Sequence, residues 1–135
     1  MLTRVQEWLA PTDPQSKLLV SLKLRTTGTG KWYLRSAKYK AWKAGGTSFT
    51  WLYGSAGSGK TILSAGIIKD MQEFCAENLA KSLAFFFFDF NDVEKQDPAN
   101  MVKSLLSQFL NRCNSVPDTV RSLYATCENE RREAS

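Results

Sequence analysis

The chain has 135 residues, of which 43% are hydrophobic and 23% are charged, and its net charge at pH 7 is +5. This is the length of one domain, and the balance is that of a globular chain rather than a disordered one. The longest apolar run, residues 83–88, is too short to span a bilayer, and the first ten residues carry charges and no secretory apolar segment. Three cysteines and no histidine exclude zinc-site spacing and a Cys–His catalytic pair. We therefore expect reduced thiols and a cytoplasmic protein with no membrane partner.

Four or five short elements are predicted before residue 47. Apolar residues within 2–9 share one helical face, and that helix should stop at Pro11. Asp13-Pro14 starts a second helix, and residues 26–30 form a loop. Ser36 caps a further short helix through Trp42, which Gly45-Gly46 closes.

Positive charge is concentrated between residues 21 and 46. This segment has no acidic residue and holds seven basic residues and four aromatic ones: Lys23, Arg25, Lys31, Arg35, Lys38, Lys40, Lys43, Trp32, Tyr33, Tyr39 and Trp42. Such interleaving fits single-stranded nucleic acid, through phosphate contacts and base stacking. It also fits a solvated helical face whose aromatic rings pack against the core. We favour the second interpretation, so nucleic acid is an unlikely partner.

The most informative motif is the sequence G-x-x-x-x-G-K-T at residues 54–61. Its members are Gly54, Ser55, Ala56, Gly57, Ser58, Gly59, Lys60 and Thr61. A strand-like run, residues 49–53, precedes the motif, and a helix-like run follows it. The glycines allow backbone N–H groups to surround a polyphosphate, Lys60 reaches the β- and γ-phosphates, and the Thr61 hydroxyl joins the coordination of Mg²⁺. The motif predicts a nucleotide-binding site.

The remaining elements alternate between helix and strand. A helix of about five turns is predicted from Thr61 to Cys75, followed by a Phe-rich strand over residues 82–90. Asp97-Pro98 begins another helix, and its double apolar stripe up to Leu110 fits core packing better than a partner-binding face. Pro117 opens a last helix that fades into the charged tail 128–133.

This order predicts the α/β class, as an incomplete P-loop NTPase fold. We divide the chain into a helical N-terminal segment, residues 1–46, and a partial NTPase domain, residues 47–135. No apolar run ending in paired acids occurs between residues 61 and 135, so the usual second magnesium ligand is missing and no catalytic residue is assigned. Two strands make a poor sheet, so we expect a fragment, with low solubility caused by residues 85–88.

Several segments together resemble fungal NACHT-type STAND NTPases that carry a nephrocystin-like N-terminal region. They are R-x-x-G-T-G-x-W-Y-L at residues 25–34, an aromatic-x-x-Trp at 39–42, W-L-Y-G leading into the phosphate loop at 51–54, F-F-F-D-F-N-D at 86–92 followed by Lys95-Gln96, and S-L-L-S-Q at 104–108. The resemblance covers nearly the whole chain. Its specific part is the G-T-G-x-W and F-F-D-F-N-D segments, because the phosphate loop is common to many NTPases.

The resemblance implies an intracellular switch that binds ATP or ADP with Mg²⁺. ADP would favour a closed state, and exchange for ATP would permit assembly with a second copy or with another NACHT-family protein. Gly28, Thr29 and Gly30 would lie on the adenine or ribose side of the nucleotide, although a purely structural turn is an equal alternative. Asp89 would point toward the γ-phosphate or, as we favour, cap the next turn.

Our leading interpretation is therefore the nucleotide-binding part of a NACHT-type switch, competent for binding but not for more than trace hydrolysis. A non-enzymatic module that docks on full-length relatives through the Phe-rich segment and the 101–110 helix is the alternative. A basic nucleic-acid-binding protein is the third and weakest interpretation.

Overall fold

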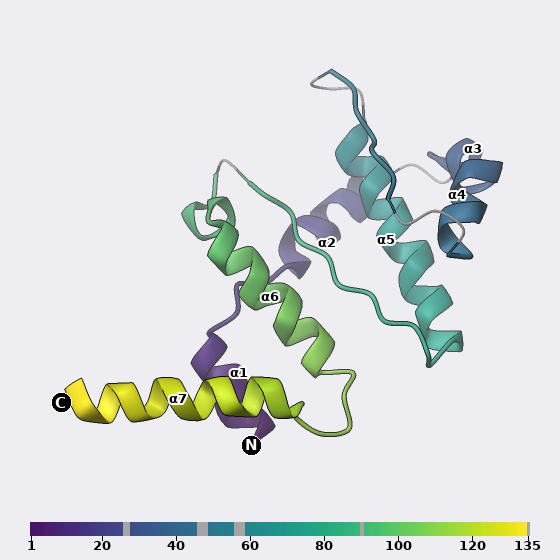
Figure 1. Cartoon of the computed structure of the whole chain (residues 1–135). Coiled ribbons are helices and arrows are strands. Elements are labelled where there is room, and N and C mark those ends of the chain that lie inside the picture. The colour runs from purple at the N-terminus through teal and green to yellow at the C-terminus, as the bar shows by residue number, and fades with distance from the viewer. Residues whose placement is uncertain (26–27, 46–48, 56–58, 90, 135) are drawn as a thin grey trace. The chain divides into compact units, whose positions relative to one another are not determined.

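The structure is a computed structural model of the whole chain and describes residues 1–25, 28–45, 49–55, 59–89 and 91–134. Its contacts divide the chain into two compact units (Figure 1). The terminal unit comprises residues 1–14 and 82–135, and the central unit comprises residues 15–81. The boundary that the sequence suggested at residue 46 stays a prediction.

The expected α/β fold is wrong. All regular structure in the described residues is helical, with seven α-helices, one 3₁₀ helix and no strand. Residues 49–53 and 82–89, both expected as strands, have no regular secondary structure, and Phe90 lies outside the described residues. The physical reason is that a strand persists only through hydrogen bonds to a neighbouring strand. Neither segment has such a neighbour among the described residues.

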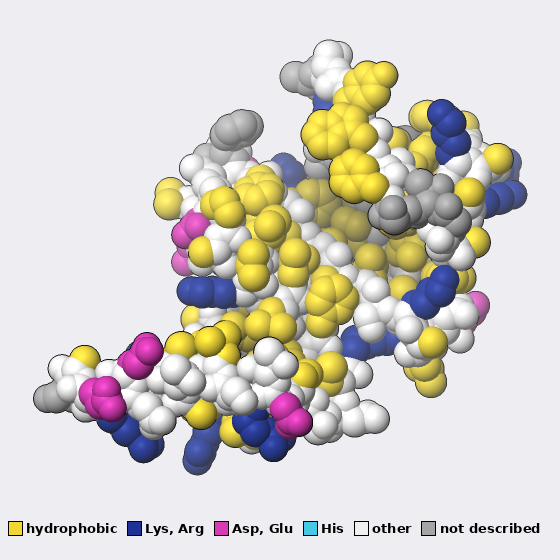
Figure 2. All heavy atoms as spheres, viewed as in Figure 1, with side chains coloured by type: hydrophobic (Ala, Val, Ile, Leu, Met, Phe, Trp, Pro, Cys, Tyr) yellow, Lys and Arg dark blue, Asp and Glu magenta, His cyan; other side chains and the backbone are white. Residues whose placement is uncertain are grey.

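The backbones of the two segments, which lack a neighbouring strand, have different surroundings. In the terminal unit the Gln108 side-chain amide replaces a neighbouring strand at one residue: Phe85 N–H donates to Oε1 at 3.1 Å, and Nε2 donates to the Phe85 carbonyl at 2.8 Å. In the central unit, residues 49–53 lie open to solvent, and Phe49, Trp51 and Tyr53 are 71%, 72% and 84% exposed. Figure 2 shows hydrophobic side chains projecting along the segment that leads into the phosphate loop.

The central unit is built on its longest helix. Its elements are α2 (Gln15–Leu24), α3 (Lys31–Leu34), α4 (Ala37–Lys43) and α5 (Lys60–Glu77). Helix α2 packs against α5, with Leu18 and Ser21 buried on one side and Ala65 and Gly66 on the other. The small residues allow the backbones to approach closely. The expected five-turn helix after the phosphate loop is confirmed.

Helix α4 is attached to α5 by a polar cluster around Asp70. The Tyr39 hydroxyl donates a hydrogen bond to Asp70 Oδ2, and Lys43 Nζ forms an ion pair with the same oxygen at 2.8 Å. Lys43 Nζ also lies 4.8 Å from the centre of the Phe74 ring. Burial by itself raises the pKa of Asp70, but the hydrogen bonds from Lys43 and Tyr39 and the lysine charge outweigh it and lower that pKa. The pKa of Tyr39 is raised well above its ordinary value, mainly because the side chain is buried and also because its hydroxyl donates a hydrogen bond to Asp70.

The basic and aromatic segment therefore belongs mostly to the packing of this unit. Tyr33 and Tyr39 are buried with ring centres 5.4 Å apart, and Tyr39 lies 5.9 Å from Trp42. Rings that are packed against one another inside a unit are not available for stacking on bases. Trp32 differs, because it is 74% exposed.

The terminal unit has a small apolar core between its first helix and its last two. Its elements are α1 (Leu2–Leu9), η1 (Val93–Gln96), α6 (Pro98–Leu110) and α7 (Asp118–Ala134). Its core residues are Val5, Leu9, Leu110 and Val116, with Trp8, Leu106, Val120 and Tyr124 packed around them. The α6 stripe is thus used partly for packing, as favoured, while Val102 and Phe109 are 58% and 44% exposed.

Local capping signals were reliable predictors of helix starts. The Ser36 side chain accepts the Tyr39 N–H at 3.2 Å, and the Asp97 carboxylate accepts the Ala99 N–H at 2.9 Å, so both expected caps are confirmed. Helix α1 ends before Pro11, also as expected. Helix α7, however, continues to Ala134 through the segment expected as a fading tail, where Arg131 pairs with Glu128 at 3.3 Å.

Two further observations bear on earlier expectations. No helix within the described residues is both long and apolar enough to cross a membrane. The three cysteines, all within the described part of the chain, are not joined in disulfides.

Replacing Asp70 by Asn should lower the free energy of unfolding at pH 7 by about 1–2 kcal/mol, because a charged hydrogen-bond acceptor is lost. The folded pKa of Asp70 is depressed, so its stabilisation is complete above the ordinary aspartate pKa of about 3.9 and disappears as the pH falls through the folded value. Urea unfolding between pH 3 and 7 should therefore show a smaller acid-induced loss in Asp70→Asn than in the wild type.

Glu73→Gln is the matched control for this experiment, because Glu73 is exposed on the same helix. An equal acid-induced loss of stability in the wild type and Asp70→Asn would contradict the role assigned to Asp70.

Candidate phosphate-binding site

The phosphate loop ends at a glycine that starts α5. Gly59 is the N-cap residue, with φ 88° and ψ 12°, and its carbonyl accepts the Leu63 N–H at 2.9 Å. A positive φ is inexpensive only for glycine, which explains why this residue type stands at the junction. The first backbone N–H groups of a helix have no acceptors within the helix, and the helix dipole places partial positive charge there. The start of α5 therefore favours an anion.

Lys60 folds back over the loop. Its Nζ donates hydrogen bonds to the carbonyl oxygens of Gly54 and Ser55, the second at 2.7 Å. The ammonium group thus lies against the backbone of the same loop that would surround a phosphate. Phosphate oxygens are stronger acceptors than neutral carbonyls, so an anion in the loop would compete for this ammonium group.

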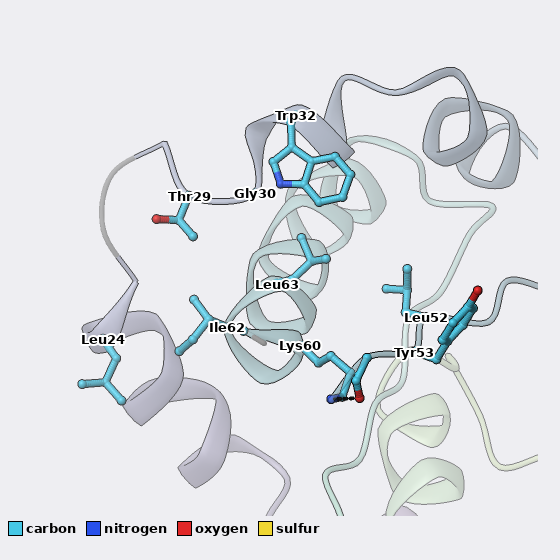
Figure 3. A pocket seen from close by; sticks show the side chains of 11 residues that line it. Leu24, Thr29, Gly30, Trp32, Leu52, Tyr53, Lys60, Ile62 and Leu63 are labelled. Carbon is cyan, nitrogen blue, oxygen red and sulfur yellow. Dashed lines mark hydrogen bonds between the residues drawn. The ribbon is translucent and has the colours of Figure 1, made fainter. Parts of the chain in front are cut away.

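A cavity of about 490 Å³ opens beside this loop (Figure 3). It is lined by Leu24, Thr29, Gly30, Trp32, Leu52, Tyr53, Gly54, Gly59, Lys60, Ile62 and Leu63. Its size falls within the range of sites for small ligands. Three of these residues belong to the phosphate loop, and Thr29 and Gly30 come from the turn predicted for the nucleoside side. The fold of the central unit thus brings two separately predicted segments to one cavity.

The turn at residues 28–30 has a backbone conformation that favours glycine, and it lies close to α5. Gly28 and Gly30 have φ 89° and 81°, and a Cβ atom added to Gly30 would lie 2.9 Å from Leu63 Cδ1. Arg25 secures the same turn, because its Nε and Nη2 donate to the Thr29 carbonyl at 3.0 and 2.9 Å. A Cβ on Gly66 of α5 would lie 3.1 Å from the Arg25 guanidinium carbon. Arg25 is a positioning residue that the sequence analysis had assigned to the basic segment and to the R-x-x-G-T-G motif.

Charge is divided unequally between the two units. Residues 15–81 hold eleven basic and three acidic residues, a net charge of +8, whereas the terminal unit holds seven basic and ten acidic residues, a net charge of −3. The acids of the central unit, Asp70, Glu73 and Glu77, all lie in the second half of α5. No acid lines the cavity, so its field favours an anionic ligand.

Residues 28–135, which are more than half of the chain, match the family described as nephrocystin 3, N-terminal. The chain belongs to this family. The matched region begins at the first glycine of the turn and includes the phosphate loop and the Phe-rich segment. No curated protein and no solved structure matches the chain.

Not every predicted site residue of this nephrocystin 3 N-terminal domain lines the cavity. Gly54, Gly59 and Lys60 do, whereas Ser55 reaches the site through its carbonyl bond to Lys60. Thr61 is exposed beside Lys60. Ala56, Gly57 and Ser58 lie outside the described residues. Within the part of the chain that is described, no cluster of His, Cys, Asp or Glu side chains could hold a metal ion.

Other residues depart from, or add to, the predicted set. The Asp89 carboxylate accepts the Asn91 N–H at 3.0 Å, so it caps the following turn, as favoured over a contact to phosphate. Trp32, Leu24 and Leu63 line the cavity and were not predicted. For Trp32 a signal was available, since it follows the Gly-Thr-Gly turn by two residues.

Gly30→Ala should destabilise this domain more than Gly45→Ala. Both glycines have a positive φ, at 81° and 87°, but only Gly30 has a neighbour, whereas a Cβ on Gly45 would meet nothing within 4 Å. We expect a loss of about 1 kcal/mol for Gly45→Ala from backbone strain alone, and a somewhat larger loss of about 1–2 kcal/mol for Gly30→Ala because the end of the Leu63 side chain must also shift. Chemical denaturation of both variants measures the difference, and equal losses would contradict the close packing of the turn on α5.

Proposed function

We propose that the central unit binds ATP and ADP together with Mg²⁺, and that the chain is the nucleotide-binding part of a NACHT-type signalling switch. The observation that carries the proposal is the presence of Lys60, Gly59 and Gly54 in one cavity with the Thr29-Gly30 turn. A phosphate loop alone supports only a phosphate site. A second segment beside it supplies a place for the nucleoside.

The residues of the cavity suit the phosphate part of such a ligand. Lys60 supplies the cation, and Gly59 opens a helix whose first N–H groups can donate hydrogen bonds to an anion. The net charge of +8 on residues 15–81 attracts a polyphosphate at long range and raises its rate of association. Each of these features favours a nucleotide over a neutral ligand.

The fit to Mg²⁺ is partial. Thr61 would hold the ion through its hydroxyl, in the position next to Lys60 where this motif places a magnesium ligand. Mg²⁺ retains several waters and takes further oxygens from the phosphates, so one protein ligand is compatible with binding. When bound, the ion would neutralise part of the phosphate charge.

A switch requires that ATP and ADP interact differently with two states of the protein. The expectation of a closed ADP state and an assembling ATP state rests on the resemblance in the 25–34 and 86–92 segments. Lys60 is the residue through which a γ-phosphate would be sensed, because its ammonium group lies at the loop and a phosphate oxygen would compete with the carbonyls that it now contacts. A second copy or a relative of the same family is the partner class that this mechanism requires.

Lys60→Ala should abolish nucleotide binding while leaving the domain folded. Mg-ATP at one hundred times its Kd should stabilise the wild type by about 2.7 kcal/mol, seen as a rise in Tm. The rise should vanish in Lys60→Ala and persist in Lys69→Ala, a matched exposed lysine farther along α5. A cooperative melt of the wild type that Mg-ATP does not shift, confirmed by calorimetric titration, would refute the proposal.

The isolated chain should hydrolyse ATP at no more than trace rates. Hydrolysis needs an acidic group near the γ-phosphate to bind metal and orient water. In the central unit the nearest acid along α5 is Asp70, ten residues beyond Lys60, or about 15 Å at 1.5 Å per residue. Steady-state phosphate release by the purified wild type, absent in Lys60→Ala, would show that a group outside this unit completes the site.

A further inference from the structure

Trp32 is placed unlike the two tyrosines of the basic and aromatic segment. Trp32 is 74% exposed, although its neighbours in the cluster, Tyr33 and Tyr39, are 8% and 2% exposed. An exposed indole forgoes a large gain from burial, so its position suggests a surface that a ligand covers. Trp32 also lines the cavity that contains Lys60.

Trp32 and Lys60 lie at different ends of this cavity. Gly30, two residues before Trp32, packs against Leu63, which lies three residues and thus nearly one helical turn beyond Lys60. In Figure 3 the Leu63 side chain lies between the indole and the lysine. The cavity therefore has a cationic end at the phosphate loop and an aromatic end at Trp32.

The indole is held in place from two sides. Its ring centre lies 5.8 Å from that of Tyr33 in an edge-to-face arrangement, and Tyr33 in turn packs on buried Tyr39. The backbone before it is secured by the bonds from Arg25 to the Thr29 carbonyl. A ring fixed in this way loses little conformational entropy when a ligand stacks on it.

We propose that Trp32 is the nucleobase platform of this site, on which the base stacks while the phosphates lie at Lys60. The inference rests on the proposed nucleotide binding and adds to it the residue that distinguishes a nucleotide from an inorganic polyphosphate. Stacking on an aromatic ring is tolerant of base identity, because every base presents a π-face. Apart from Trp32 and the residues of the phosphate loop, the lining includes Leu24, Leu63 and Thr29, which offer few groups to read base edges. The site therefore discriminates only weakly between ATP and GTP.

Other exposed aromatic residues do not meet these conditions. Trp51 is 72% exposed but does not line the cavity. Tyr53 lines it, but it directly precedes Gly54 and so belongs to the phosphate end. Trp51 is for that reason the matched control for Trp32.

The test is calorimetric titration of the 135-residue chain with Mg-ATP, Mg-GTP and magnesium tripolyphosphate. The variants are Trp32→Leu, Trp32→Phe, Trp51→Leu and Lys60→Ala. Trp32→Leu should weaken the affinities for ATP and for GTP about tenfold each, which corresponds to about 1.4 kcal/mol of binding free energy. The affinity for tripolyphosphate should not change. Trp32→Phe should retain part of the affinity for the two nucleotides, and Trp51→Leu should retain all of it. Lys60→Ala should bind none of the three ligands.

Each ligand is compared with itself across variants, so the different charges of ATP and tripolyphosphate do not affect the result. Because Trp32 is exposed, its variants should melt like the wild type, and quenching of indole fluorescence by ATP should disappear in Trp32→Leu but not in Trp51→Leu. Equal ATP affinity in the wild type and Trp32→Leu would contradict the proposed stacking on Trp32 but not the proposed phosphate binding at Lys60. Failure of the wild type to bind any of the three ligands would instead overturn the proposed function, and the platform with it.

Discussion

The close approach of the 28–30 turn to α5 is the constraint on which the candidate site depends. A Cβ on Gly30, which has φ 81°, would lie 2.9 Å from Leu63 Cδ1, and Arg25 binds the Thr29 carbonyl while its guanidinium lies beside Gly66 of the same helix. Without this packing the turn and Trp32 would not lie beside the phosphate loop. The cavity therefore depends on Gly30, Gly66 and the Arg25 guanidinium as well as on the loop.

Signals confined to a few neighbouring residues predicted structure well, and signals that depend on distant partners did not. Ser36 and Asp97 cap helices because each side chain satisfies a backbone N–H two or three residues away. The β-prone composition of residues 49–53 and 82–89 was equally clear, yet a strand also needs a hydrogen-bonding neighbour, which sequence composition does not provide. Phe85 finds its partner in the side chain of Gln108, which no periodicity analysis anticipates.

The same distinction applies to the site. The order of glycines around Lys60 predicted the start of α5 and the residues beside it, because a phosphate loop is a local motif. The neighbourhood of Thr29, Gly30 and Lys60 was inferred from a resemblance, and contacts within the central unit now supply its physical basis. Trp32 was counted among the packed aromatic residues together with Tyr33 and Tyr39, although its place two residues after the Gly-Thr-Gly turn was a signal that set it apart.

Charge connects the stability of the central unit to its proposed ligand. A net charge of +8 on 67 residues, 15–81, opposes folding through self-repulsion, and Asp70, in the second half of α5, offsets part of it by binding Lys43. At the start of the helix, Lys60 Nζ donates to the carbonyl oxygens of Gly54 and Ser55. A polyphosphate anion bound there would add negative charge to a unit of net positive charge. Ligand binding should thus stabilise the unit most at low ionic strength, where the repulsion it relieves is least screened.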